Sequence, residues 1–171
     1  MEVVLTSHRY GEKELLKQLK DLGVFYRTSF KDVIRGSVEN LETFLQELEK
    51  KSIFTLSRVV PIEKSFSFSP RSIFEEFCEA VKPLLEQIRN GDSFSVIVER
   101  RGLKRAFSSQ EIAKEVGTFI SKVLEERDGI KPRVNLRDPD KAVIFETLDR
   151  WCGIGIISKE MREKHFYLKL P

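Results

Sequence analysis

The chain has little of the residues that most often carry catalysis or bind metal ions. Its 171 residues include two cysteines, two histidines and one tryptophan. Cys78 and Cys152 lie far apart in the sequence, and neither His8 nor His165 has a Cys or carboxylate partner at a recognised ligand spacing. Because metal sites and disulfide frameworks need clustered ligands or several cysteines, we expect no metal, no cofactor and two buried thiols.

Enzyme motifs and membrane segments are also absent from the sequence. It contains no nucleophile elbow, phosphate-binding loop, HExxH motif or Ser-His-Asp arrangement. Asp138 and Asp140 flank Pro139, a pattern more typical of a turn than of a catalytic carboxylate pair. No apolar run approaches the roughly 18 residues that span a bilayer, and no basic-then-apolar leader opens the chain. We therefore expect a non-catalytic, cytoplasmic protein that does not enter membranes.

The charge balance limits which partners are plausible. Charged residues make up 33% of the chain, but the net charge is only +3. A nucleic-acid partner would therefore require the positive charge to gather on one face. The high charge content, the 13 phenylalanines and the scarcity of Cys and Met are typical of a thermophilic protein.

The first part of the chain alternates between strand and helix patterns in the order βαββαβ. The expected strands cover residues 3–5, 24–26, 32–38 and 53–62, and the expected helices cover 11–22 and 40–51. Two helices over a four-stranded antiparallel sheet form the ferredoxin-like, split βαβ arrangement. The sequence thus predicts an α+β protein whose N-terminal ferredoxin-like domain occupies residues 1–65.

A Ser-rich connection at 64–70 leads into a second α/β domain, expected over residues 66–171. A helix to about residue 90 should break at Pro83, because proline removes a backbone hydrogen bond. Ser108, with Glu111 three residues later, predicts the start of another helix, in which Gly117 should allow close packing against a neighbour. The expected strands cover 93–99, a short segment at 134–136, 142–148, 153–158 and, at the end, 166–170.

A cluster of cations follows the strand at 93–99. Arg100, Arg101, Lys104 and Arg105 fill the loop before the helix that starts near Ser108. Arginine offers paired donors to phosphate, and the amides of a helix N-terminus add positive potential. This pattern predicts an anion-binding loop; the alternative is a solvated turn whose arginines pair with glutamates.

Further cations and one aromatic residue could extend this surface. Lys131, Arg133 and Arg137 flank the short strand at 134–136, and would enlarge the same patch if that strand pairs beside 93–99. Trp151 could stack on an unpaired base, although a tryptophan at a turn more often covers the core.

The order of segments in the second half resembles the THUMP domain. The resemblance rests on SFSVIVERRG, SSQEIAKEVGTFI, VNLRDPDKAVIFE and GIGII, with Asn135 where the family more often has Asp. It implies a preceding ferredoxin-like domain and recognition of the tRNA acceptor stem and 3′ end. On that basis Arg100, Arg101, Lys104 and Arg105 are the leading RNA contacts, and Lys131, Arg133 and Arg137 the secondary ones.

The resemblance favours one function and leaves two others open. Stand-alone THUMP proteins resemble the adaptor of tRNA N4-acetylcytidine formation, which implies a partner RNA cytidine acetyltransferase that receives the bound tRNA. The chain could instead be the binding portion of a larger tRNA-modifying enzyme, since the family usually carries a catalytic domain. A small-ligand-binding or regulatory protein built from ferredoxin-like modules is the third hypothesis. Neither the tRNA species nor the oligomeric state follows from the sequence.

Overall fold

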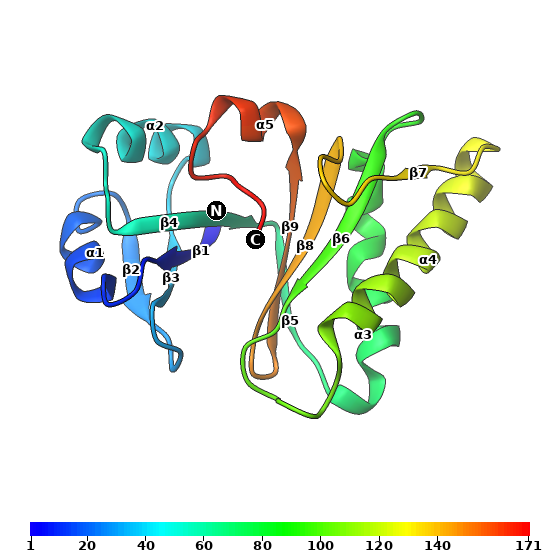
Figure 1. Ribbon diagram of the computed structural model, residues 1–171, viewed down its shortest axis with the longest axis horizontal. Helices are drawn as coiled ribbons and strands as arrows, with labels where there is room; N and C mark the ends of the chain where they lie inside the picture. The colour runs from blue at the N-terminus through cyan, green and yellow to red at the C-terminus, as the bar shows by residue number, and fades with distance from the viewer. The chain divides into compact units, whose positions relative to one another are not determined.

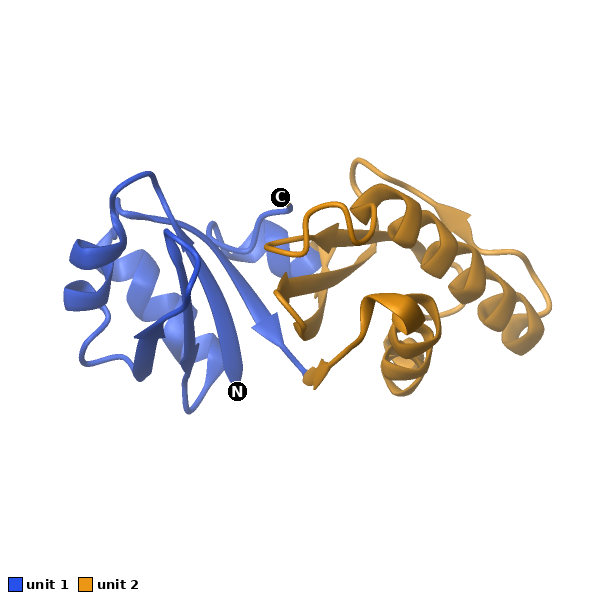
Figure 2. Cartoon of the chain, turned by 90° about the horizontal axis from the view of Figure 1, so that it is seen from below, with its two compact units in different colours: residues 1–63, 160–170 blue, residues 64–159, 171 orange.

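A computed structural model describes residues 1–171, which form two compact units (Figures 1 and 2). The first unit comprises Met1–Glu63 and Glu160–Leu170, and the second comprises Lys64–Lys159 with Pro171. The predicted division placed everything after residue 65 in the second domain. The structure differs at the C-terminal end, because residues 160–170 return to the first unit.

The first unit has the predicted βαββαβ order. Its elements are β1 (Glu2–Ser7), α1 (Glu12–Gln18), β2 (Val24–Arg27), β3 (Val33–Ser37), α2 (Leu41–Lys51) and β4 (Leu56–Ile62). The sheet has the order β2-β3-β1-β4, and every neighbouring pair is antiparallel. Each crossover helix therefore joins two strands that are separated by a third, as in the ferredoxin-like fold.

Local sequence signals explain both helices of this unit. Leu15 and Leu19 are fully buried beneath α1, and Phe44 and Leu48 are buried beneath α2 at helical spacing. The side chain of Asn40 caps α2 by accepting a hydrogen bond from the Thr43 backbone amide at 2.9 Å.

The C-terminal segment is held on the first unit by buried contacts. It follows α5 (Lys159–Lys164) and forms no strand, so the predicted strand at 166–170 is wrong. The His165 ring lies between two carboxylates of α2, 3.0 Å from Glu42 and 2.8 Å from Glu49. The hydroxyl of Tyr167 donates to the Ile53 carbonyl at 3.0 Å. These contacts link residues more than 100 positions apart in the chain, which local patterns do not reveal.

The second unit is a five-stranded sheet with two main helices. Its elements are β5 (Lys64–Ser67), η1 (Pro70–Ser72), α3 (Ile73–Val81), η2 (Lys82–Gln87), β6 (Ser93–Glu99), α4 (Ser109–Asp128), β7 (Arg133–Val134), β8 (Lys141–Leu148) and β9 (Trp151–Ser158). The strand order is β5-β9-β8-β6-β7. β6 runs parallel to β7 and β8, whereas β9 is antiparallel to β8 and β5.

Helices α3 and α4 lie together on one face of this sheet (Figure 1). The core between the layers includes the stacked rings of Phe77 and Phe145, whose centroids are 4.5 Å apart. The predicted helix break occurs at η2, which begins at Lys82 and has Pro83 as its second residue. Residues 64–67, expected to be a connection, form an edge strand instead, because they pair with β9. No helix has both the length and the apolar character needed to cross a bilayer.

Candidate nucleic-acid interface

The two predicted groups of cations lie at opposite ends of β6. The short strand β7 pairs with β6 as expected, but its register sets Ser93 beside Arg133 and Phe94 beside Val134. The Arg100–Arg105 loop instead follows the other end of the strand, after Glu99. The seven residues of β6 separate these ends by about 20 Å. The continuous patch expected along β6 is therefore not formed.

The Arg101 side chain is largely buried and forms an ion pair within the second unit. Its guanidinium pairs with the carboxylate of Glu146 on β8, and the side chains are 13% and 0% exposed. Its backbone amide donates to the Thr147 hydroxyl at 3.2 Å, and its carbonyl accepts from the Asp149 amide at 2.9 Å. Arg101 thus anchors the loop to β8 and to the turn after β8. It was predicted as a leading RNA contact, and the structure places its charge against a buried carboxylate.

The other three cations of the loop form no ion pair within the protein. Arg100 is half-buried and donates from Nη1 to the Gly102 carbonyl at 2.9 Å. Lys104 and Arg105 are exposed and have no partner within the protein. Leu103 packs against the core of the second unit with a positive φ of 50°. The left-handed backbone costs about 1 kcal/mol at a residue with a Cβ, so the anchored loop keeps a shape that the chain alone disfavours.

A further cation, Arg150, lies beside this loop and was not among the predicted site residues. It occupies the tight turn between β8 and β9, is exposed, and has no partner within the protein. The turn is joined to the loop by the hydrogen bond between Asp149 and Arg101. The Arg150 carbonyl also accepts from the Phe68 amide at 2.9 Å. A basic residue in a two-residue turn between apolar strands was the signal that could have identified it.

The N-terminus of α4 adds to the positive potential at this end of the sheet. The Ser108 side chain accepts from the Glu111 amide at 3.3 Å, which confirms the predicted helix start at Ser108. The first amides of this 20-residue helix follow directly on the cationic loop. We call Arg100, Lys104, Arg105 and Arg150 the β6-end surface. Its three exposed cations and the helix dipole suit it to bind phosphate.

The remaining predicted cations, at the other end of β6, differ in their contacts. Lys131 and Arg137 are exposed and have no side-chain partner within the protein, whereas Arg133 donates to the Gly91 carbonyl at 2.9 Å. The Asn135 side chain accepts from the backbone amides of Arg137 and Asp138, which shapes the loop as an Asx turn.

Both aspartates beside Pro139 have structural roles, in agreement with the predicted turn. Asp138 pairs with Lys159 at 2.8 Å. Asp140 accepts from the backbone amide and the hydroxyl of Ser93, at 2.8 and 3.1 Å. These bonds, led by the one from the backbone amide, lower the pKa of Asp140 against the opposing effect of burial.

The two thiols are buried and the tryptophan is partly covered. Cys78 and Cys152 are buried and free, and burial raises the pKa of Cys78 to about 11 and that of Cys152 well above its usual range. No group of three or more His, Cys, Asp or Glu residues is arranged to hold a metal ion. Trp151 is half-buried at the start of β9, opposite Leu148.

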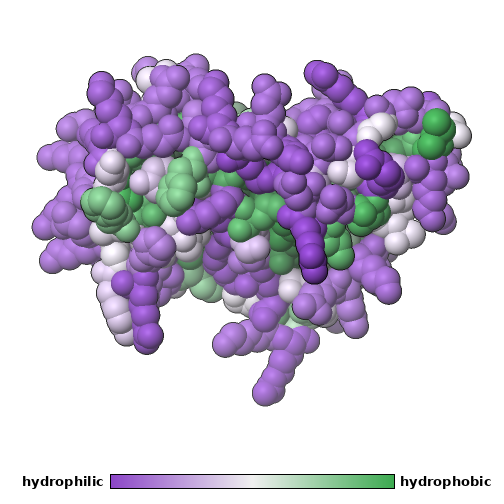
Figure 3. Space-filling view, turned by 45° about the horizontal axis from the view of Figure 1, so that its top comes forward, coloured by the Kyte–Doolittle hydropathy of each residue, from purple (hydrophilic) through white to green (hydrophobic).

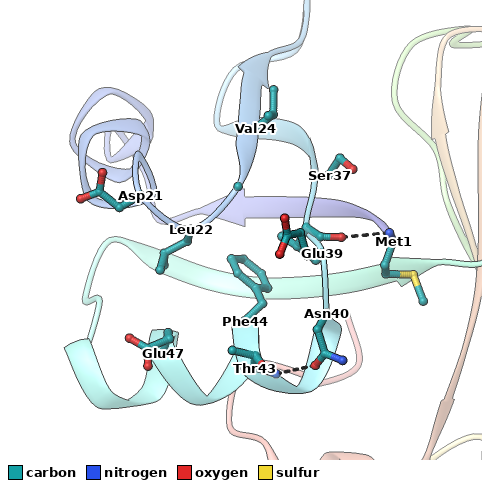
Figure 4. A pocket seen from close by; sticks show the side chains of 12 residues that line it. Met1, Asp21, Leu22, Val24, Ser37, Glu39, Asn40, Thr43, Phe44 and Glu47 are labelled. Atoms are coloured by element: carbon teal, nitrogen blue, oxygen red, sulfur yellow. Dashed lines mark hydrogen bonds between the residues drawn. The ribbon is translucent and has the colours of Figure 1, made fainter.

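A hollow of about 950 Å³ in the first unit has the wrong charge for RNA (Figure 4). It lies beside the start of α2, where Asn40 caps the helix. Its lining includes the carboxylates Asp21, Glu39 and Glu47 and no Lys or Arg side chain. An RNA backbone would be repelled here, so the cations of the second unit remain the better candidates.

Comparisons with known proteins place the second unit in a family. Residues 71–157 match the THUMP domain. A probable tRNA sulfurtransferase from Methanosarcina acetivorans is 39% identical over 59 residues, which are 34% of this chain and 14% of that protein.

Solved structures share the fold at lower identity. TrmN from Thermus thermophilus superposes with a TM-score of 0.69 at 19% identity, over 91% of this chain and 44% of that one. A 4-thiouridine synthetase in complex with RNA and ATP gives a TM-score of 0.60 at 20% identity, over 91% of this chain and 40% of that one. The chain therefore spans less than half of either structure. Because the THUMP match extends from η1 into β9 and covers half of the residues, this chain belongs to the THUMP domain family.

Proposed function

We propose that this protein binds tRNA during tRNA modification and holds the acceptor end on the β6-end surface. Membership of the THUMP family supports this function, as do the names of the similar proteins, a probable tRNA sulfurtransferase and a synthetase in complex with RNA. The observation that carries the proposal is the set of exposed cations without partners, Lys104, Arg105 and Arg150, on two turns joined by a backbone hydrogen bond.

The chemistry of this surface suits positioning rather than reaction. Lysine and arginine side chains bind phosphate oxygens and release counterions from the RNA, which gives affinity that depends on salt and little on sequence. The hydrogen bond from Asp149 to Arg101 and the packing of Leu103 hold the cations in place before RNA arrives. Less ordering is then required on binding, which increases affinity.

In this proposal the protein is a non-catalytic adaptor. It presents the bound tRNA to a separate enzyme, an RNA cytidine acetyltransferase that forms N4-acetylcytidine. When the adaptor and the enzyme contact the same tRNA, the effective concentration of the enzyme near that tRNA rises without any new chemistry. A second candidate, the RNA-binding portion of a larger modifying enzyme, is favoured by one observation: the similar proteins are much longer than the matched region.

A salt titration of tRNA binding tests the proposal. Affinity for total tRNA is measured by fluorescence anisotropy between about 50 and 200 mM salt, for the wild type and for Lys104→Ala/Arg105→Ala/Arg150→Ala. We expect the triple variant to lose more than tenfold in affinity, and the slope of log K against log salt to fall by about 2–3, because each lost phosphate contact removes just under one counterion.

One matched control and one further variant make the result specific. Lys50→Ala/Lys51→Ala removes two cations from the last turn of α2 in the first unit and should leave tRNA affinity within twofold. Lys131→Ala/Arg137→Ala tests the predicted secondary contacts at the other end of β6. The proposal is wrong if the wild type fails to bind tRNA at low salt, or if the triple variant binds as well as the α2 control.

A further inference from the structure

A groove of about 690 Å³ lies between α4 and β7 and is lined by none of the residues of the β6-end surface. Its lining is mainly apolar and comes from three parts of the second unit. Side chains and backbone that line it include Phe94 and Val96 of β6, Ala113 and Gly117 of α4, and Val134 and Leu136 at β7. The α4 wall runs from Gln110 to Ser121, which is about 17 Å of helix.

Gly117 lines this groove and leaves space beside α4. The sequence predicted that this glycine allows close packing against a neighbour. In the structure, a Cβ built at Gly117 would meet only one neighbouring atom within 4 Å, Cγ2 of Val96 at 3.8 Å. A glycine in the middle of a helix costs about 1 kcal/mol relative to alanine, yet packing within the unit does not use the space it leaves. The space is available to another molecule.

The wall on the β7 side exposes large aliphatic side chains. Val134 is 57% exposed and Leu136 is 77% exposed. Val134 ends the two-residue strand β7, and Leu136 follows it in the loop; β7 forms one edge of the sheet, so its outer side has no neighbouring strand. Figure 3 shows apolar atoms surfacing among hydrophilic ones at the right-hand end of the molecule, where Figure 1 places β7 and α4. Apolar surface of this kind, bordered by polar groups, is typical of an interaction site.

The charges around the groove indicate the chemistry of its occupant. The charged residues of the lining are Lys114 and Lys131, both exposed, and no carboxylate lines the groove. Neither lysine has a partner within the protein. A partner that places apolar side chains in the groove and carboxylates at its borders would match both features.

Two other occupants fit less well. A second copy of the chain, packed groove to groove about a twofold axis, would bring the lysines of both copies together, which costs binding energy. A nucleobase would need an exposed ring on which to stack. The one aromatic residue in the lining, Phe94, is fully buried.

We propose that this groove docks a short, acidic, amphipathic segment of a partner protein. Apolar side chains of the segment enter the space beside Gly117 and contact Leu136, while its carboxylates pair with Lys114 and Lys131. Lys131, predicted from the sequence as an RNA contact, then serves protein binding instead. The proposal does not depend on tRNA binding, because the groove shares no residue with the β6-end surface.

Selection of peptides by the full chain tests this assignment. A phage library of random 16-residue peptides is panned on the wild type, with soluble Leu136→Asp protein present to remove peptides that bind elsewhere. Leu136 is largely exposed, so this change leaves the core intact. Enriched peptides are then synthesised with a fluorescent label, and their affinity is measured by anisotropy.

We expect enriched peptides with net negative charge and at least two apolar residues on one face. Their affinity should fall at least tenfold with Leu136→Asp and with Lys114→Glu/Lys131→Glu. It should change less than twofold with Lys122→Glu, an exposed lysine of α4 outside the lining. Amide chemical shifts of Ala113, Gly117 and Val134 should move on binding.

Three outcomes overturn the proposal. The first is that no enriched peptide depends on Leu136. The second is that the enriched peptides are neutral or basic. The third is that tRNA displaces the peptide and moves the groove amides itself, which would assign the groove to RNA. Because tRNA binding is measured separately on variants of the β6-end surface, failure of either proposal leaves the other standing.

Discussion

Replacing Arg101 should lower the free energy of unfolding of the second unit. Any loss of tRNA binding by such a variant should result from this loss of stability. Arg101 is paired with Glu146, whose side chain is fully buried. Removing the guanidinium alone leaves this carboxylate inside the sheet without its arginine. Breaking a buried ion pair from one side costs about 3–5 kcal/mol.

The size of this effect sets the expected change in a denaturation curve. With a urea dependence of about 2 kcal/mol per molar, the loss moves the midpoint of Arg101→Ala downward by about 1.5–2.5 M. Lys104→Ala removes an exposed side chain without a partner, so its free energy of unfolding should change by less than about 0.5 kcal/mol. The two cations lie three positions apart and differ in what they contact.

Tryptophan fluorescence provides the assay, because Trp151 is the sole tryptophan and begins β9 of the same unit. A second variant, Arg101→Leu/Glu146→Leu, removes both charges and should recover most of the lost stability, since apolar pairs replace buried ion pairs well. If this double variant is stable, it should also bind tRNA within a few-fold of the wild type.

Two results would refute this reasoning. One is an Arg101→Ala protein that unfolds at the wild-type urea concentration. The other is a stable Arg101→Leu/Glu146→Leu protein that loses as much tRNA affinity as the triple variant of the β6-end surface. The second result would make Arg101 a direct RNA contact, as the sequence alone suggested.

Two further predictions follow from groups outside the interface. Cys78 and Cys152 should react with a thiol reagent at pH 8 far more slowly in the native protein than in urea, because burial raises both pKa values; equal rates would contradict their burial. Asp140 has a lowered pKa in the fold, so its contribution to stability is present above its ordinary value of 3.8 and is lost as pH falls through the lower folded value. Asp140→Asn should therefore flatten the pH dependence of the urea midpoint in that acid range, and an unchanged profile would show that Ser93 does not stabilise the carboxylate.

Signals that act over a few residues were visible in the sequence. The βαββαβ pattern, the break at Pro83 and the cap at Ser108 all appear in the structure, because helix periodicity, proline and capping residues act within a turn or two of the backbone. Strand boundaries were less certain: residues 64–67 look like a connection until β9 pairs with them.

The contacts of the cations could not be predicted from the sequence. Four of them share one loop and look equivalent in the sequence. In the structure Arg101 faces a carboxylate 45 positions away, while Lys104 and Arg105 face solvent. Arg150 joins them from a turn that follows a different strand. Contacts between distant segments decide which charge is neutralised, and these depend on the register of the whole sheet.

The sequence by itself determined the βαββαβ order of the first unit, the THUMP family and the presence of a cationic loop, because each depends on residues close together along the chain. The tertiary structure decided three other things. It set the two cation groups at opposite ends of β6, returned the C-terminal segment to the first unit, and left the groove beside Gly117 open. Each of these depends on strand register or on burial between remote residues, which the chain acquires only when it folds.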